Sequence, residues 1–329
     1  MNGEALMELT HVGKDFAAAR TLGGWLKRRI AGGSAPKVRA VDDVSLTIGR
    51  SEVVGLVGES GCGKSTLGRI AAGLIPPSRG RVTLDGIEVS AMPRAARRRA
   101  MMRVQMVFQS AAASLNPRQT VRRILEEPLA VHRLAPRSER ADRVVELLRR
   151  IGLHPAFLDR YPHQLSGGQC QRIGIARALT VAPDLIICDE PVSALDVSIQ
   201  AQILNLFQDL QEQLRLSYLF ISHDLSVVQR VSDRVVVMYL GRMVEEAPAG
   251  ELFARPRHPY TVALLAAAPR LGAAAGPEAI VKGERPSPFA PPPGCHFHPR
   301  CPHAMDVCRR VVPERREVSP GHWSACHLD

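Results

Sequence analysis

Short apolar runs recur along this chain, and most are followed by a longer stretch with helical spacing. Runs this short and this apolar are typical of strands buried on both faces of a parallel sheet. Residues 41–48 alternate apolar and polar side chains, which predicts a half-buried strand, and residues 6–16 predict a further short strand. The pattern therefore indicates an α/β fold, a mixed sheet with flanking helices. Buried strands are expected at residues 53–57, 104–108, 185–188, 218–222 and 235–240, with 241–244 closing the sheet.

Two regions depart from this alternation of strand and helix. Turn residues flank Val82-Thr83-Leu84, which predicts a hairpin over residues 78–86 in an antiparallel β subdomain. Residues 111–161 have a helical pattern, with Ser138 as a candidate cap. Together with a helix expected from about 165 to 179, they predict an inserted helical subdomain of about residues 111–180. Its apolar stripe is formed by Val144, Leu147, Leu148 and Ile151.

A glycine-rich segment, GESGCGKS, separates the strand at 53–57 from an apolar-periodic run that starts at Thr66. Glycines let the backbone curl with its N–H groups inward, and those donors bind phosphates together with the positive end of the next helix. In such a loop Lys64 reaches the outer phosphates and Ser65 offers its hydroxyl to Mg²⁺. The sequence therefore predicts a nucleotide site formed by Gly58, Glu59, Ser60, Gly61, Cys62, Gly63, Lys64, Ser65 and Thr66.

Polar side chains follow three of the predicted buried strands at the point where each strand ends. Gln109 follows the strand at 104–108, Asp189 and Glu190 follow 185–188, and His223 follows 218–222. Ligands of open α/β sheets bind at this carboxyl edge. Asp189 is placed to hold Mg²⁺ there, Glu190 to activate a water as general base, and His223 to sense or polarise the γ-phosphate. Cys188 is interpreted as a small core residue.

Leu165-Ser166-Gly167-Gly168-Gln169 opens a second helix with exposed backbone donors. Ser166 is a plausible N-cap, so this pentapeptide is either a second anion site or an ordinary glycine-rich helix start. The loop 193–196 leads into a helix at 197–214. Phe16, at the end of the first strand, either stacks on an adenine ring or is an ordinary core residue.

The chain has 329 residues, 45% of them hydrophobic, and a net charge of +11. This length allows one large α/β domain with an appendage, and the charge favours acidic partners such as nucleotides, nucleic acid or an anionic membrane face. No unbroken apolar stretch is long enough for a transmembrane helix, and Met1–Thr10 lacks the apolar region of a signal peptide. We expect a cytosolic protein or one peripheral to a membrane. Two segments are rich in basic residues, and each has two interpretations. Residues 25–30, which are basic and aromatic, form either a contact with a membrane or partner or a solvated loop. Residues 92–102, which are rich in arginine, form either a solvated helix face or a surface for an acidic partner.

Pro and Ala dominate beyond about Gly250, which predicts a linker-like stretch to Pro293. Four cysteines follow, at Cys295, Cys301, Cys308 and Cys326. In a cytosolic chain cysteines are thiols or metal ligands rather than disulfides. Four thiols in a loop-like segment suit a [4Fe–4S] cluster or Zn²⁺, and the spacing, which lacks the C-x2-C of zinc knuckles, favours iron–sulfur. Four free surface thiols are the alternative.

The phosphate loop, Gln109, residues 165–169, Asp189-Glu190, residues 193–196 and His223 stand in the order found in ABC-transporter ATPase subunits. The resemblance covers residues 6–265, and the Leu-Ser-Gly-Gly-Gln motif separates this family from other P-loop proteins. It implies a P-loop NTPase core over residues 1–265, and a Cys-rich C-terminal extension over residues 266–329. A P-loop kinase would have no use for the motif at 165–169.

A finer resemblance is to the ATPases of oligopeptide/dipeptide importers. It rests on residues 57–62, Ser114-Leu115-Asn116-Pro117-Arg118, residues 193–198, His258-Pro259-Tyr260 and the tail at 294–302. One departure is Ser110-Ala111, where that family usually has Asp-Pro in a segment that faces the permease. Import of nickel, glutathione or another small solute is the alternative within transport, and a soluble ABC ATPase acting on nucleic acid is the alternative outside it.

The resemblance implies ATP hydrolysis with Mg²⁺ in a head-to-tail dimer with a second ATPase subunit, at the cytoplasmic face of the membrane. Each nucleotide would lie between the phosphate loop of one subunit and Ser166, Gly167, Gly168 and Gln169 of the other. Glu190 would polarise water, His223 would hold the γ-phosphate, and Gln109 would touch Mg²⁺; Asp196 and Phe16 complete the nucleotide-binding set. Two permease subunits and an extracytoplasmic peptide-binding protein are the implied partners, with no nucleic acid.

Overall fold

The computed structural model describes residues 4–17, 37–267, 284, 286–287 and 289–329. Within these residues the main sheet has eight strands in the order β11-β12-β10-β9-β3-β8-β7-β6. The strands from β9 to β6 run parallel, and β10, β12 and β11 join them antiparallel, so the predicted mixed sheet is confirmed. The strands are β3 (Val53–Val57), β6 (Val104–Val107), β7 (Leu185–Asp189), β8 (Ser217–Ile221), β9 (Arg234–Tyr239), β10 (Arg242–Pro248), β11 (Arg316–Ser319) and β12 (His322–Ser324).

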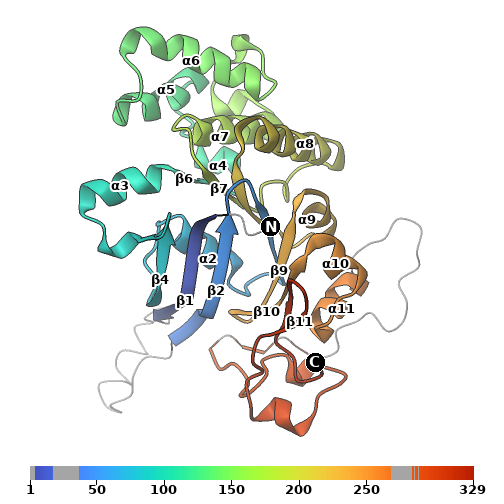
Figure 1. The fold of residues 1–329 in the computed structure, drawn as a ribbon. Coiled ribbons are helices and arrows are strands. Elements are labelled where there is room, and N and C mark those ends of the chain that lie inside the picture. Colours follow the sequence, from blue (N-terminus) through green and yellow to red (C-terminus); the bar gives the residue numbers. More distant parts are fainter. Residues whose placement is uncertain (1–3, 18–36, 268–283, 285, 288) are drawn as a thin grey trace, which may run out of the picture.

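A smaller antiparallel sheet, β2-β1-β4-β5, lies beside the main sheet (Figure 1). Its β4 and β5 form the predicted hairpin, which turns at Asp85 and Gly86, both with positive φ. Leu67 and Ile70 of α2 (Lys64–Ala71) pack into one core with residues of both sheets, so α2 is enclosed between them. The strands are β1 (Ala5–Ala17), β2 (Lys37–Gly49), β4 (Arg79–Leu84) and β5 (Ile87–Glu88).

The opposite face of the main sheet is covered by helices, with α5 and α6 farthest from the chain's C-terminus (Figure 1). The predicted stripe packs inward: Val144, Leu148 and Ile151 are fully buried in a core that includes Cys188 and Phe220 of the sheet. The helices are α4 (Ala111–Ser114), α5 (Val121–Val131), α6 (Arg137–Arg150), α7 (Gly167–Leu179), α8 (Val197–Leu214) and α9 (Leu225–Val231).

The helix caps in this region differ from the sequence prediction. Ser138 does not cap α6: the helix begins at Arg137 with Pro136 as its N-cap, and Ser138 is exposed within the first turn. Pro136 has an extended backbone with ψ 156°, and the first turn of the helix begins directly after it, one residue before Ser138. Ser110 does cap a helix, because its hydroxyl accepts a hydrogen bond from the Ala113 amide at the start of α4.

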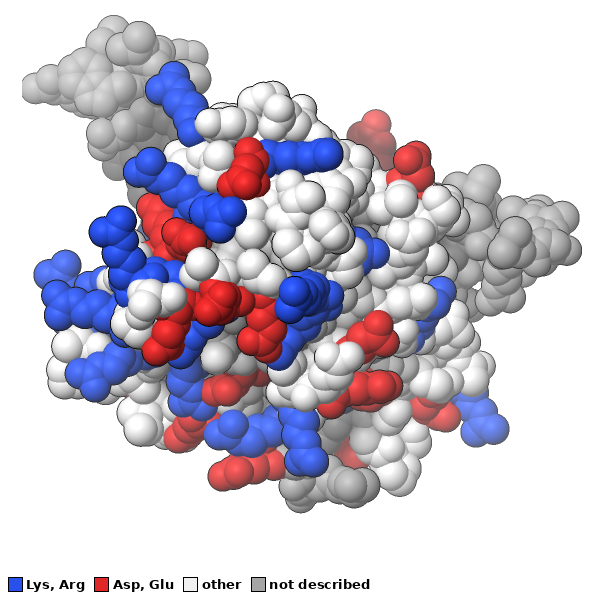
Figure 2. Space-filling model, turned by 90° about the horizontal axis from the view of Figure 1, so that it is seen from above, with Lys and Arg blue, Asp and Glu red and all other residues white. Residues whose placement is uncertain are grey.

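The arginine-rich helix α3 (Arg94–Met102) has no buried residue, which fits both a solvated helix face and a surface for an acidic partner. Seen from the helical end of the molecule, Lys and Arg gather mainly toward one side and alternate with Asp and Glu (Figure 2). The basic aromatic segment 25–30 lies outside the described residues.

The linker predicted from Gly250 to Pro293 is wrong for its first part. Residues there form α10 (Ala249–Ala254) and α11 (Pro259–Ala267), and Leu252 and Tyr260 are fully buried. Both helices pack on β9 and β10 in a third core with Phe297. The sequence did not predict these helices because the stretch is rich in Pro and Ala, and only a few large side chains make the packing contacts.

The chain after Pro293 also returns to the main sheet, so β10 is not its edge. Glu246 of β10 pairs with Trp323 of β12, and β11 adds beyond β12. The Glu245 carboxylate, 2% exposed, accepts hydrogen bonds from the amides of Arg257 and His258, at 2.6 and 3.0 Å. The fully buried ring of His322 lies 2.8 Å from the same carboxylate. One buried acid thus joins β10, the entry to α11 and the C-terminal strands.

We predict that Glu245→Ala destabilises the protein by roughly 3 kcal/mol, because it leaves two backbone amides, one of them buried, and a buried imidazole without their acceptor. The urea midpoint for unfolding measures the change. Glu314→Ala is the control, since the Glu314 side chain is 81% exposed and its partner Arg316 is also at the surface. Equal midpoints for the two variants would contradict this account of the Glu245 contacts.

Candidate nucleotide-binding site

The phosphate loop connects the end of β3 to the start of α2, as its sequence predicts. Its glycine residues are needed for the shape: Gly63 has φ +109°, and a Cβ there would lie 2.1 Å from the carbonyl oxygen of Ala40. The Lys64 side chain, in a residue only 4% exposed, donates to the carbonyls of Gly58 and Glu59 at 2.6 and 3.0 Å. Lys64 therefore folds back along the loop that it follows. Cys62 is buried behind the loop.

The two oxygen donors predicted for Mg²⁺ lie side by side. The Ser65 hydroxyl donates a 2.7 Å hydrogen bond to Oδ1 of Asp189, at the end of β7. Burial raises the pKa of the Asp189 carboxyl above its ordinary value, although the bond from Ser65 works in the opposite direction. A cation at this position favours the charged carboxylate, so the site suits a bound Mg²⁺.

Gln109 and His223 both reach the Glu190 carboxylate. Gln109 Nε2 donates to Glu190 Oε2 at 3.0 Å, and His223 Nδ1 lies 3.2 Å from the same oxygen. The Glu190 side chain is 14% exposed, and its amide donates to the carbonyl of Ile221 in β8. Its φ of +49° is in a region that residues with a side chain rarely occupy. The Glu190 carboxylate, which follows β7, therefore lies between Gln109, which follows β6, and His223, which follows β8.

One contact of this cluster escaped the sequence analysis. Gln109 Nε2 also lies 3.3 Å from Oγ of Ser193, and the Ser193 hydroxyl donates to the Glu190 carbonyl at 3.1 Å. The sequence predicts Ser193 only as part of the loop into α8. The position of this hydroxyl, three residues after Glu190, is the feature of the sequence from which the contact could have been predicted.

The second glycine motif forms the start of α7. Ser166 Oγ accepts from the Gln169 amide, and Gln169 Oε1 accepts from the Ser166 amide, a reciprocal capping box. Ser166 and Gly167 are exposed. Gly168 lies against α8, where a Cβ would be 2.5 Å from Ile199 Cγ2. The helix start is therefore firmly built, yet it presents its N-cap residue to the outside.

Two further predicted nucleotide contacts lie at the surface. Asp196 is the exposed N-cap residue of α8 and makes no side-chain capping bond. Phe16 is 41% exposed near the end of β1, with the Lys14 amine 5.4 Å from its ring centroid. The interpretation of Phe16 as an ordinary core residue is therefore wrong, and its ring is open to a ligand.

The four C-terminal cysteines line one pocket. Cys295, Cys301, Cys308 and Cys326 surround it together with His298, His303 and His327. Burial raises the pKa of the Cys326 thiol to about 11. Among the described residues, no three His, Cys, Asp or Glu side chains are arranged so that they would hold a metal ion. The four cysteines lie around one pocket rather than being dispersed over the surface, but their side chains are not close enough together to coordinate a metal ion.

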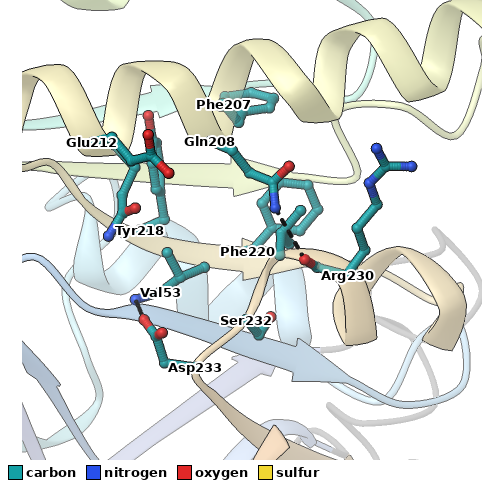
Figure 3. A pocket seen from close by; sticks show the side chains of 11 residues that line it. Val53, Phe207, Gln208, Glu212, Tyr218, Phe220, Arg230, Ser232 and Asp233 are labelled. Atoms are coloured by element: carbon teal, nitrogen blue, oxygen red, sulfur yellow. Dashed lines mark hydrogen bonds between the residues drawn. The ribbon is translucent and has the colours of Figure 1, made fainter.

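A separate pocket of about 210 Å³ lies at the opposite edge of the sheet (Figure 3). It is lined by Val53 at the start of β3, Tyr218 in β8, and Phe207 and Gln208 of α8. The hydroxyl of Tyr218 is buried with no partner among the described residues. Since the phosphate loop follows the other end of β3, this pocket is not part of the nucleotide site.

No helix among the described residues combines the length and the apolar character needed to cross a membrane.

Two family models match the chain. The model described as ABC transporter matches residues 41–193, and the model described as oligopeptide/dipeptide transporter, C-terminal region, matches residues 244–308. The oligopeptide transport ATP-binding protein AppF of Bacillus subtilis is 50% identical over 331 residues, which cover 99% of this chain and 98% of AppF.

Solved structures give the same fold. CbiO1 of Clostridium perfringens, part of the ABC transporter complex cbiONQ, aligns with a TM-score of 0.63 and 26% identity over 77% of this chain and 92% of CbiO1. The ATP-binding cassette MJ0796, a dimer in a post-hydrolysis state with ADP and Pi, aligns with a TM-score of 0.62 and 28% identity over 74% of this chain and 98% of the cassette. The chain belongs to the ABC-transporter ATPases and, within them, to the ATP-binding subunits of the oligopeptide/dipeptide importers.

Proposed function

We propose that this ATPase subunit of a peptide importer hydrolyses ATP with Glu190 as general base. The observation that carries the proposal is the convergence of Gln109 and His223 on one oxygen of Glu190. These contacts hold the carboxylate at the carboxyl edge of β7, next to the Ser65–Asp189 pair that follows the phosphate loop. A carboxylate held in this way can take a proton from water as the water attacks the γ-phosphate.

The other residues of the edge bind and orient the substrate. The backbone of residues 58–63 and the start of α2 would cradle the phosphates, with Lys64 on the outer ones. Ser65 and Asp189, with Gln109 beside them, would hold Mg²⁺, which neutralises phosphate charge. Phe16 has an exposed ring for the adenine, and every base offers a face on which such a ring can stack.

We infer that a second ATPase subunit completes each site. Ser166 and Gly167 are exposed at the start of α7, where free backbone donors and the helix dipole suit the γ-phosphate of a nucleotide held by another subunit. Phosphoryl transfer needs charge stabilised from several sides, and one phosphate loop supplies only one of them. Asp196, exposed at the start of α8, would lie at the same interface.

The partners and location follow from the subfamily. The second subunit, two permeases and an extracytoplasmic peptide-binding protein would form the importer, with this chain at the cytoplasmic face of the membrane. The match of residues 244–308 to the oligopeptide/dipeptide C-terminal model supports peptides as the transported class.

We further propose that the C-terminal cysteines hold a [4Fe–4S] cluster or Zn²⁺. All four line one pocket, and thiolates are preferred ligands of both groups. The donor set therefore fits, although binding must draw the side chains closer together than they are in the described structure. A bound group would cross-link η4 (His298–Arg300), η5 (Asp306–Arg309) and the residues after β12, so its role here is structural.

We predict that Glu190→Gln lowers ATP turnover by about 10²–10⁴-fold, because an amide cannot accept the proton from water. The dissociation constant for MgATP should stay within about threefold of the wild-type value, since Gln109 and His223 retain a hydrogen-bonding partner. Phosphate release and equilibrium binding measure the two effects. Glu139→Gln, on the exposed face of α6, is the control; near-normal turnover of Glu190→Gln would remove Glu190 from the role of base.

We predict that Glu190→Gln forms a dimer with ATP and that adding Ser166→Arg prevents it, because the larger cation obstructs the helix start offered to the other subunit. Sedimentation of the protein with its partner ATPase subunit, with and without ATP, measures association. Ser138→Arg, equally exposed but on α6, should not affect it. Unchanged ATP-dependent association of the Ser166→Arg protein would argue against a site shared between subunits.

We predict that protein purified without oxygen contains iron with acid-labile sulfide, or zinc, and that Cys301→Ser lowers this content at least severalfold. Elemental analysis and the visible absorption spectrum provide the measurement. Cys170→Ala is the control, because Cys170 is buried in α7 and does not line the pocket. Colourless, metal-free protein would instead favour free thiols.

A further inference from the structure

The segment between Cys295 and Cys301 reaches the phosphate loop. Its 3₁₀ turn η4 ends at Arg300, whose Nη1 and Nη2 donate to the two carboxylate oxygens of Glu59, each at 3.0 Å. The side chains are only 8% and 18% exposed. Figure 1 shows the C-terminal segment below α11 and next to β11. Bidentate pairs of this geometry are among the stronger polar contacts in proteins.

A second contact holds the backbone of the same residue. Tyr260 in α11 accepts a 2.9 Å hydrogen bond from the Glu59 amide with its hydroxyl oxygen. The Tyr260 ring is fully buried, with its centroid 4.6 Å from that of Tyr239 and 5.4 Å from that of Phe297. Arg300 also lies over the Tyr239 ring, 5.9 Å from its centroid. An aromatic cluster shared by β9, α11 and the C-terminal segment thus supports both contacts.

Glu59 is consequently held at three points. Arg300 binds its carboxylate, Tyr260 binds its amide, and its carbonyl accepts from Lys64 Nζ at 3.0 Å. The first half of the phosphate loop is therefore fixed by residues more than 200 positions later in the chain.

The negative charge of Glu59 means that its contact with Arg300 affects the affinity of the loop for ATP. A carboxylate in a loop that binds triphosphate repels the ligand, and the repulsion is largest where water is excluded. The guanidinium of Arg300 is always charged and sits directly on that carboxylate. With Arg300 in place, Glu59 can anchor the loop without opposing the phosphates.

We propose that Arg300 is a positioning residue for ATP: it neutralises Glu59 and fixes the phosphate loop in its binding shape. The inference rests on the proposed binding of ATP at this loop, but not on the roles proposed for Glu190 or the cysteines. The C-terminal segment thereby acts on nucleotide affinity, in addition to any group that its cysteines bind.

The experiment compares Arg300→Gln, Arg300→Lys, Glu59→Gln and the double variant Glu59→Gln/Arg300→Gln in the full chain. Calorimetry with MgATP gives dissociation constants, phosphate release gives KM and kcat, and thermal unfolding reports on folding. Arg309→Gln, an exposed arginine in the same segment, is the matched control.

We expect Arg300→Gln to raise the dissociation constant and KM for MgATP about tenfold, with kcat changed less than twofold. Arg300→Lys should recover most of the loss, because it restores the charge without the bidentate geometry. Glu59→Gln should bind MgATP at least as well as the wild type, and the double variant should bind better than Arg300→Gln alone. The loss in Arg300→Gln should shrink as salt rises.

A purely structural bridge would give a different result, because either single substitution would then weaken binding equally and salt would not matter. That outcome, or unchanged affinity of folded Arg300→Gln, would overturn the proposal. If Arg300→Gln does not fold, Glu59→Gln decides by itself: weaker binding of MgATP refutes the charge argument. Failure of the wild-type protein to bind MgATP would instead count against the proposed function.

Discussion

Parallel pairing of β3, β8, β7 and β6 is the constraint on which the chemistry of this protein depends. Because these neighbours run in the same direction, their carboxyl ends meet at one edge of the sheet. The phosphate loop, His223, the Asp189-Glu190 pair and Gln109 each follow one of these strands. None of these side chains is close to another in sequence except the acidic pair. Their separations of about 3 Å therefore depend on strand order and register.

The proposal of a site shared between two subunits rests on this edge together with the start of α7. The phosphate loop lies at this edge, and at the start of α7 the residues Ser166 and Gly167 are exposed. The capping box at Ser166 and the close approach of Gly168 to α8 fix the geometry of this helix start. The exposed N-cap residue of α7 is consistent with the proposed second subunit as its counterpart.

The C-terminal segment packs into the ATPase core and is not a separate appendage. Buried Glu245 joins it to β10, β12 extends the main sheet, and Phe297 enters the core formed with Tyr239 and Tyr260. Through Arg300 the segment then contacts Glu59 of the phosphate loop. Stability of the C-terminal region and shape of the nucleotide site are therefore linked by direct contacts.

The sequence by itself determined the parts of this protein whose signal is local. Apolar runs located the parallel strands but not β11 and β12, and the segment at 58–65 defined the loop with its glycines. Polar residues after three of the strands marked the edge, because each of these patterns reflects the geometry of a few neighbouring residues. Contacts between distant residues were decided only by the tertiary structure. The residues around Arg300 did not predict its contact with Glu59, and those around His322 did not predict its contact with Glu245. The helices at 249–267 were predicted as a linker, because burial against another element leaves no periodic pattern in a short stretch rich in proline and alanine.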